Sequence, residues 1–139
     1  MNKLWLDDVR KPPDDSWSWR KSMEEAKQFV MENECDEWAL DHDLGGQLAH
    51  YGTGVYDHAA ATGFDFVKAC LQFLPKPPKR VWIHSTNTTG AIEMAGLLYV
   101  WAAHTQTDIE IILKPMLGRI IDMNPYYDPK LRAKTPVVD

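Results

Sequence analysis

Short strand-like runs alternate with longer helix-like segments along most of this chain, and this alternation limits the folds open to it. Helix-like segments at 23–33, 63–74 and 88–104 follow the second, third and fourth of these runs. Such alternation is typical of α/β proteins with a parallel sheet covered on both faces. We therefore predict a five-stranded parallel sheet in the order 2-1-3-4-5 with right-handed crossovers. The expected strands span residues 3–6, 17–20, 37–40, 80–83 and 109–113.

The limits of the helices can also be predicted from local signals. The segment between the first two strands is too short for a regular helix with its turns, so the first helix is expected to be reduced. Ser22 is expected to cap the helix at 23–33, with Glu25 completing a capping box. Thr62 is expected to cap the helix at 63–74, which the proline-rich residues 75–79 end.

Polar residues directly follow four of the five predicted strands. Ligands of open parallel sheets bind beyond the carboxyl ends of the strands, so these residues are expected to meet at one rim. This convergence is a stronger signal than any of the motifs alone. The four polar groups are Asp7-Asp8, Asp41-His42-Asp43, His84-Ser85-Thr86-Asn87 and Lys114-Pro115.

The carboxylates at this rim predict a divalent metal site. Carboxylates brought together repel each other, and a hard cation such as Mg²⁺ relieves the repulsion. We expect Asp8 and Asp41 as the main ligands, with Asp7 and Asp43 beside them. The simpler alternative is that Asp7 and Asp8 only cap a turn. Asp43 has two open roles, since its side chain can bind metal or cap the following turn while its carbonyl binds.

Two histidines and a lysine add acid–base and phosphate chemistry to the predicted rim. His42 and His84 stand at adjacent strand ends beside carboxylates, where a group titrating near neutral pH suits proton transfer. The alternative for each is a packed, hydrogen-bonded structural histidine. Lys114 with the polar side chains of Ser85 and Asn87 would hold a phosphoryl group. The tryptophans of the strands, Trp5, Trp38 and Trp82, are expected in the core.

These motifs resemble the receiver domains of two-component response regulators. The resemblance places Asp8 as a metal ligand, Asp7 beside it, Asp41 as the phospho-acceptor, Ser85 as the phosphate-contacting hydroxyl and Lys114 as the phosphate-bridging base. It also implies a flavodoxin-like fold. Ordinary receivers lack the Asp-His-Asp triplet and the histidine before the serine, and their first helix is full length.

A divergent branch of that fold fits the sequence better. The motifs "LWLDDVR", "LDHDLGG", "TGFDFV" and "HSTNTTG", together with Met94, are similar to the cyclic-phosphate processing receiver-like family. The similarity runs from about residue 3 to about residue 96, and Lys114-Pro115 extends it. It implies processing of cyclic phosphates on RNA ends or nucleotides.

Charge and composition exclude some partners. The formal net charge of −5 argues against non-specific binding to duplex DNA, although a local pocket can still hold a phosphate-containing small molecule or an RNA end. The two cysteines form no disulfide framework, and the chain has no signal-peptide pattern or membrane span, so we expect a cytoplasmic protein. Residues 1–118 are expected to form the receiver-like domain and 119–139 an irregular C-terminal tail.

Three functions remain open from the sequence. The first is a metal-assisted phosphoesterase in which His84, His42, Asp41 and Lys114 are catalytic. The second is a single-domain receiver that is phosphorylated on Asp41, a reading that gives the two histidines no role. The third is a non-catalytic module that binds a nucleotide or a protein.

Overall fold

The computed structural model describes residues 2–44, 61–85 and 87–114 of the 139-residue chain. Each strand and helix begins and ends within two residues of its predicted bounds. In chain order the elements are β1 (Asn2–Leu6), β2 (Ser18–Arg20), α1 (Met23–Glu32), β3 (Cys35–Leu40), α3 (Gly63–Phe73), β4 (Arg80–Ile83), α4 (Thr88–Thr105) and β5 (Glu110–Leu113).

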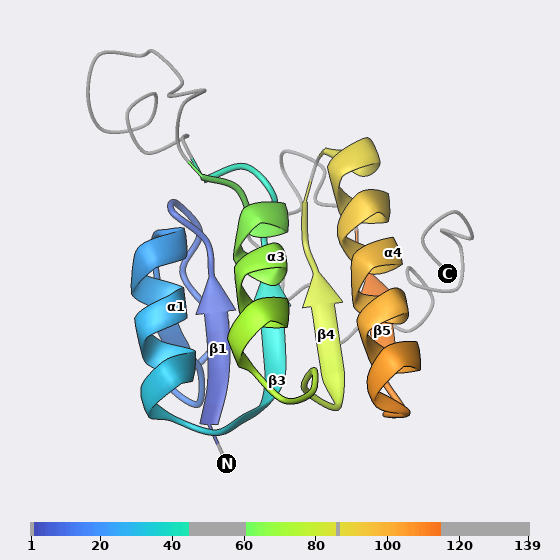
Figure 1. Ribbon diagram of the computed structural model, residues 1–139. Coiled ribbons are helices and arrows are strands. Elements are labelled where there is room, and N and C mark those ends of the chain that lie inside the picture. Colours follow the sequence, from blue (N-terminus) through green and yellow to red (C-terminus); the bar gives the residue numbers. More distant parts are fainter. Residues whose placement is uncertain (1, 45–60, 86, 115–139) are drawn as a thin grey trace.

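The five strands form one parallel sheet in the order β2-β1-β3-β4-β5, which confirms the predicted topology (Figure 1). The last residues of four strands pair in register across it: Leu6 with Leu40, Leu40 with Ile83, and Ile83 with Leu113. Because these strands end at the same level, the residues that follow them meet along one rim of the sheet. The predicted convergence of polar residues therefore follows from the register.

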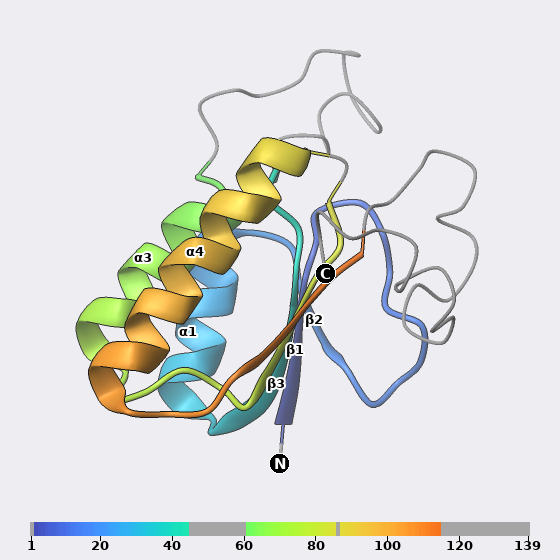
Figure 2. The ribbon, with the colours of Figure 1, turned by 90° about the vertical axis from the view of Figure 1, so that its right-hand side faces the viewer.

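The helices of the described residues, α1, α3 and α4, lie on one face of the sheet, as Figure 2 shows. The sequence predicts helical cover on both faces, and in the described part of the chain it is present on this face. A right-handed crossover places its connection on a face that depends on the direction of travel along the sheet. The connections that contain α1, α3 and α4 all lead towards β5, so they share a face. The β1–β2 connection leads the other way, and it contains no helix among its described residues 7–17.

The helix-covered face holds the larger part of the core. Leu4 and Leu6 of β1, Leu40 of β3 and Ile83 of β4 are buried there against the inner sides of the helices. Trp38 of β3 lies among them and packs against aromatic side chains of α3 and α4.

A cluster rich in tryptophan covers the opposite face of the sheet, which carries no helix among the described residues and is called the helix-free face below. Trp5 and Trp82 point to this face from the strands, because neighbouring residues of a strand alternate between its two sides. Trp17 from the β1–β2 connection packs edge-on against Trp5, with 5.7 Å between the ring centroids. Trp19 packs against the same cluster. Large indole rings here bury much of the apolar area of this face. The prediction that Trp5, Trp38 and Trp82 belong to the core is confirmed.

The helix caps agree with the sequence in part. Thr62 caps α3 in a complete capping box with Asp65. Ser22 caps α1 and accepts a hydrogen bond from the Glu25 amide, as predicted. The other half of that box was wrong, because the Glu25 carboxylate accepts from the amide of Lys21 rather than from that of Ser22.

Some predictions lie outside the described residues. These are most of the loop at 45–62, Thr86, Pro115 and the proposed tail at 119–139.

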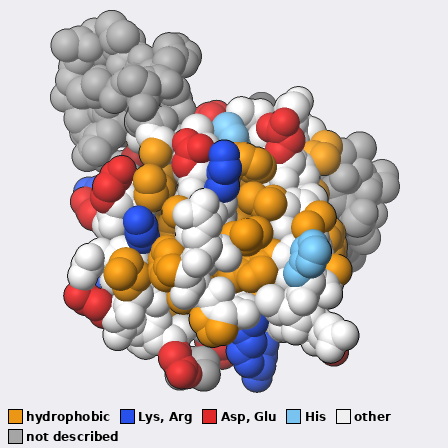
Figure 3. Space-filling model, viewed as in Figure 1, with side chains coloured by type: hydrophobic (Ala, Val, Ile, Leu, Met, Phe, Trp, Pro, Cys, Tyr) orange, Lys and Arg blue, Asp and Glu red, His pale blue; other side chains and the backbone are white. Residues whose placement is uncertain are grey.

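Within the described ranges, no helix is both long and apolar enough to cross a membrane. Several large apolar side chains reach the surface of the helical layer (Figure 3), among them Ile92, Tyr99 and Val100 of α4.

Candidate functional site

Three buried carboxylates meet at the carboxyl ends of β1 and β3. Asp7 and Asp8 follow β1, and Asp41 follows β3 in the adjacent strand. One carboxylate oxygen from each residue lies within 4.8 Å of those of the other two. We call Asp7, Asp8 and Asp41 the carboxylate cluster. It contains three of the four residues that the sequence proposed as metal ligands.

Several hydrogen bonds hold the carboxylate of Asp7 in place. Its Oδ1 accepts hydrogen bonds from the amides of Val9 and Arg10, and its Oδ2 lies 3.1 Å from Nε2 of His84. Burial raises the pKa of Asp7, but the bond to His84 and the two amides more than compensate and leave it below its usual range. Asp7 is therefore ionised at neutral pH.

The pKa of Asp41 shifts in the opposite direction to that of Asp7. Burial, and then the neighbouring Asp7, raise the pKa of Asp41 well above its usual range, and Arg10 opposes the shift. The nearby carboxylates of Asp7 and Asp8 both contribute to this rise. Carboxylate oxygens brought this close repel each other and are suited to a hard divalent cation, so these residues fit such an ion.

His84 lies beneath the rim on the helix-free face. Its ring is fully buried and stacks on Trp5, with 4.3 Å between ring centroids. Burial lowers the pKa of His84 although Asp7 opposes the change, so the ring is neutral at neutral pH. Because an ionised carboxylate can only accept, Nε2 carries a proton and donates a hydrogen bond to Asp7. This position suits an influence on the site through Asp7; the predicted direct catalytic role stays a prediction.

Indole groups fix the loop that carries Asp7. Nε1 of Trp19 donates to the Asp7 carbonyl at 2.7 Å, and Nε1 of Trp5 donates to the Arg10 carbonyl at the same distance. The tryptophan cluster therefore has a second effect besides covering the sheet, since it anchors the turn of the carboxylate cluster on two sides.

His42 lies on the other face of the sheet, beside the first turn of α4. Its Nδ1 is 2.7 Å from Oδ1 of Asp43, and the Asn87 amide nitrogen lies 3.2 Å from the same ring nitrogen and 3.3 Å from the Asp43 oxygen. Nδ1 of His42 and the side-chain nitrogen of Asn87 can both donate to Oδ1 of Asp43. A neutral ring that donates through Nδ1 has its lone pair on Nε2. A carboxylate that orients a histidine in this way is a recurring feature of general bases.

Two glycines allow this close packing. A Cβ atom on Gly90 of α4 would lie 2.5 Å from the ring of His42, so no larger residue fits while the ring keeps its place. At the start of α3, a Cβ on Gly63 would lie 2.1 Å from the Asp41 carbonyl oxygen. The Gly63 amide also donates to the His42 carbonyl at 2.7 Å. Both glycines therefore fix the chain around the Asp-His-Asp triplet.

The predicted phosphate-binding residues lie at the same rim with different local contacts. Ser85 is buried, and its hydroxyl accepts a hydrogen bond from the backbone N–H of Asn87. Asn87 caps α4 through the Gly90 amide and also contacts His42. Lys114 is buried after β5, where its amide donates to the Ile83 carbonyl of β4. Asp43 faces His42 and lies outside the carboxylate cluster.

Arg10 is a site residue that the sequence reasoning missed. Its Nη1 lies 3.5 Å from Oδ2 of Asp7 and 3.8 Å from Oδ2 of Asp41. Its place in an irregular loop gives no periodic signal. The one available clue was its position two residues after a pair of acids.

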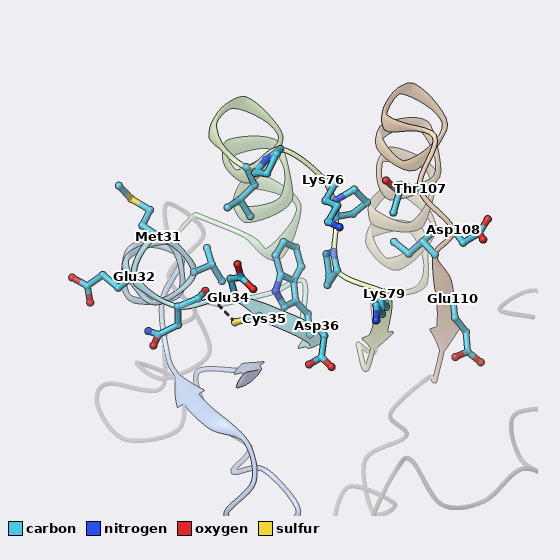
Figure 4. A pocket seen from close by; sticks show the side chains of 18 residues that line it. Met31, Glu32, Glu34, Cys35, Asp36, Lys76, Lys79, Thr107, Asp108 and Glu110 are labelled. Carbon is cyan, nitrogen blue, oxygen red and sulfur yellow. Dashed lines mark hydrogen bonds between the residues drawn. The ribbon is translucent and has the colours of Figure 1, made fainter. Parts of the chain in front are cut away.

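A groove of about 910 Å³ lies at the opposite end of the sheet (Figure 4). Glu34, Lys76 and Asp108 line it, together with apolar residues such as Trp38 and Ile109. None of the residues of the rim contributes to it. The chemistry-bearing side chains thus gather at the carboxyl ends of the strands, where parallel sheets bind their ligands, and not in this groove.

The order of the strands, the acids after β1 and β3 and the lysine after β5 together define a receiver-like domain. The model of the family described as "Cyclic-phosphate processing Receiver domain" matches residues 2–100. The chain belongs to this family, which confirms the resemblance seen in the sequence. Comparison with curated proteins found no match.

Proposed function

We propose that this protein is a metal-assisted phosphoesterase that opens cyclic phosphates on RNA ends or nucleotides. The observation that carries the proposal is the pairing of His42 with Asp43 and Asn87 beside a buried carboxylate cluster. A receiver that only accepts a phosphoryl group on an aspartate has no need of an oriented histidine. Membership of the cyclic-phosphate processing family supports the same class of substrate.

The reaction requires one water molecule and the transfer of one proton. Water attacks phosphorus, the bond from phosphorus to one ribose oxygen breaks, and that oxygen gains a proton as water loses one. His42 would take the proton of the water on Nε2, because Asp43 holds the proton of Nδ1. The same ring can then return the proton to the ribose oxygen that leaves.

Other rim residues would bind and orient the phosphate. Asp8 and Asp41 would hold Mg²⁺ or another divalent cation, with Asp7 beside them, and this ion would supply positive charge against the phosphate oxygens. Lys114 and Ser85 would contact the phosphate from the ends of β5 and β4. Asn87 would act mainly by orienting His42, since its side chain already bonds to Gly90 and contacts Asp43.

Phosphorylation of Asp41 is the second candidate function. Asp41 and Lys114 occupy the strand ends that the receiver resemblance requires, and Asp41 is buried in the carboxylate cluster. This reading does not use the contacts of His42.

One experiment separates these functions. The protein with Mg²⁺ is incubated with a 2′,3′-cyclic nucleotide, with a short RNA ending in a cyclic phosphate and, separately, with acetyl phosphate. We expect conversion of at least one cyclic substrate to a phosphomonoester, and loss of that conversion in Asp41→Asn. Labelling of Asp41 by acetyl phosphate without turnover would favour the receiver. Binding of a cyclic substrate without either reaction would favour a binding module.

A further inference from the structure

Arg10 places a permanent positive charge beside two of the three carboxylates of the cluster. Its Nη1 lies 3.5 Å from Oδ2 of Asp7 and 3.8 Å from Oδ2 of Asp41. Both distances exceed the roughly 2.7–2.9 Å of a strong charge-assisted hydrogen bond. Its Nε is buried and has no hydrogen-bond partner in the described part of the chain. The guanidinium thus balances the cluster by its charge without closing a tight fork on either acid.

The backbone of Arg10 is held much more firmly than its side chain. Its amide donates to Oδ1 of Asp7 at 2.8 Å, and its carbonyl accepts from the Trp5 indole at 2.7 Å. The side chain is 21% exposed, so its outer part borders solvent. The guanidinium can therefore move away from the acids while the loop that carries Asp7 keeps its conformation.

We propose that Arg10 is a built-in counter-ion of the carboxylate cluster, and that a divalent cation binds there in competition with its guanidinium. This inference rests on the metal site of the proposed function. A cation that binds Asp7 and Asp41 brings its charge close to Nη1, and two positive charges a few ångströms apart repel each other. The loose contacts of the guanidinium make it the group that yields.

The consequence is that Arg10 weakens the metal affinity of the site and stabilises the metal-free protein. Nη1 of Arg10 reaches both Asp7 and Asp41, so its charge offsets part of the repulsion between these two acids. Without Arg10 the cluster keeps its carboxylates and loses one positive charge that competes for them. Such a site binds a divalent cation more tightly.

The test is a calorimetric titration of Mg²⁺, and in parallel of Mn²⁺, into the full chain without any substrate. The proteins compared are wild type, Arg10→Gln, Arg10→Lys and Arg80→Gln. Arg80→Gln is a matched control because it removes the same charge at the opposite end of the sheet, where Arg80 pairs with Glu37 and Glu110. Thermal melts in a chelating buffer measure the stability of each metal-free protein.

We expect Arg10→Gln to bind the metal about tenfold more tightly or better, an effect of one unit charge at short range. Its metal-free melting temperature should fall, and saturating metal should restore it. Arg80→Gln should bind like wild type, and Arg10→Lys should lie closer to wild type than Arg10→Gln does. If Arg10→Gln does not fold without metal, its recovery on addition of metal supports the proposal, and Arg10→Lys supplies the affinity comparison.

Other outcomes count against the proposal in distinguishable ways. Equal or weaker binding by Arg10→Gln, with normal binding by wild type, would overturn the role of Arg10 and leave the metal site of the proposed function intact. Binding by neither protein would overturn both. Binding by Arg10→Gln alone would support the competition strongly, because wild type would then be blocked by its own guanidinium.

Discussion

The His84 ring and the Asp7 carboxylate form a buried pair, with 3.1 Å between Nε2 and Oδ2. The two residues directly follow β1 and β4, which are separated in the sheet by β3. Trp5 stacks on the ring from the same face, so the histidine fills the space between the tryptophan cluster and the rim. The pair therefore connects the core of the helix-free face to the carboxylate cluster.

Replacement of His84 should act on stability and on the orientation of Asp7. His84→Leu removes the imidazole donor of Oδ2 of the ionised Asp7, which costs about 1.5–3 kcal/mol of the free energy of unfolding. His84→Gln keeps an amide donor near the position of Nε2, so we expect a smaller loss, measured by thermal melts of both variants.

Turnover of a cyclic substrate separates the two roles of His84. A group that only orients Asp7 should leave His84→Gln within about tenfold of wild type, because its amide still donates to the carboxylate. A loss of about 10²–10⁴-fold with unchanged metal binding would instead show that His84 itself transfers a proton.

The larger catalytic loss is expected at His42. His42→Gln removes the Nε2 base while keeping polar contacts to Asp43 and Asn87, and loss of such a group costs about 10²–10⁴-fold in kcat. Phosphate and metal binding should persist. His104→Gln is the control, since this histidine is exposed in the last turn of α4. Equal turnover by His42→Gln and His104→Gln would remove His42 from the mechanism.

Asp41→Asn should stabilise the metal-free protein at neutral pH. The pKa of Asp41 is raised in the folded state, so folding favours its protonated form, and wild type loses this stability as the pH rises through the folded pKa. Asparagine is neutral at every pH. The gain of the variant should be near zero at about pH 4, close to the unfolded pKa, and reach about 0.5–2 kcal/mol at higher pH.

Melts of both proteins between acid and neutral pH, with and without Mg²⁺, check this prediction. Mg²⁺ should raise the melting temperature of wild type, since it binds the folded state, and the variant should lose most of that rise. Asp108→Asn, an exposed site before β5, controls for the change in net charge. An equal Mg²⁺ effect in wild type and Asp41→Asn would exclude Asp41 as a ligand.

Much of the fold was predictable because each strand ends at a clear break in its pattern. The apolar residues of β3 and β4 stop at Asp41 and His84, and the pairing of Leu40 with Ile83 brings these polar residues to the same level. Helical cover of both faces was expected, and the described residues place helices on one face. The short β1–β2 connection was noticed in the sequence, but nothing there showed that tryptophans would cover the other face.

The grouping of the site residues was harder to predict, although part of the signal was present. His84 seemed close to the phosphate contacts because Ser85 follows it. Yet His84 stands two residues after Trp82, and Asp7 two after Trp5, so strand alternation places both on the helix-free face. His42 stands two after Leu40 and falls on the helical face. The contact of Arg10 with the cluster depends on a loop conformation that no periodicity describes.

The close contact between Gly90 and His42 should make alanine unfavourable at Gly90, and Gly96 of the same helix provides a control position. Alanine in place of a helical glycine normally stabilises by about 0.5–1 kcal/mol. Gly96 has open space around the position of a Cβ, so Gly96→Ala should show this gain. At Gly90 the added Cβ would lie 2.5 Å from a ring that Asp43 and Asn87 hold in place, so the gain should be cancelled or reversed.

Thermal melts compare the two variants, and the imidazole NMR signals of His42 report its orientation. We expect these signals to change in Gly90→Ala and not in Gly96→Ala, with a parallel loss of turnover. If both alanine variants gain the same stability and leave the His42 signals unchanged, the ring does not rest on Gly90, and the arrangement assigned to the proposed base is incorrect.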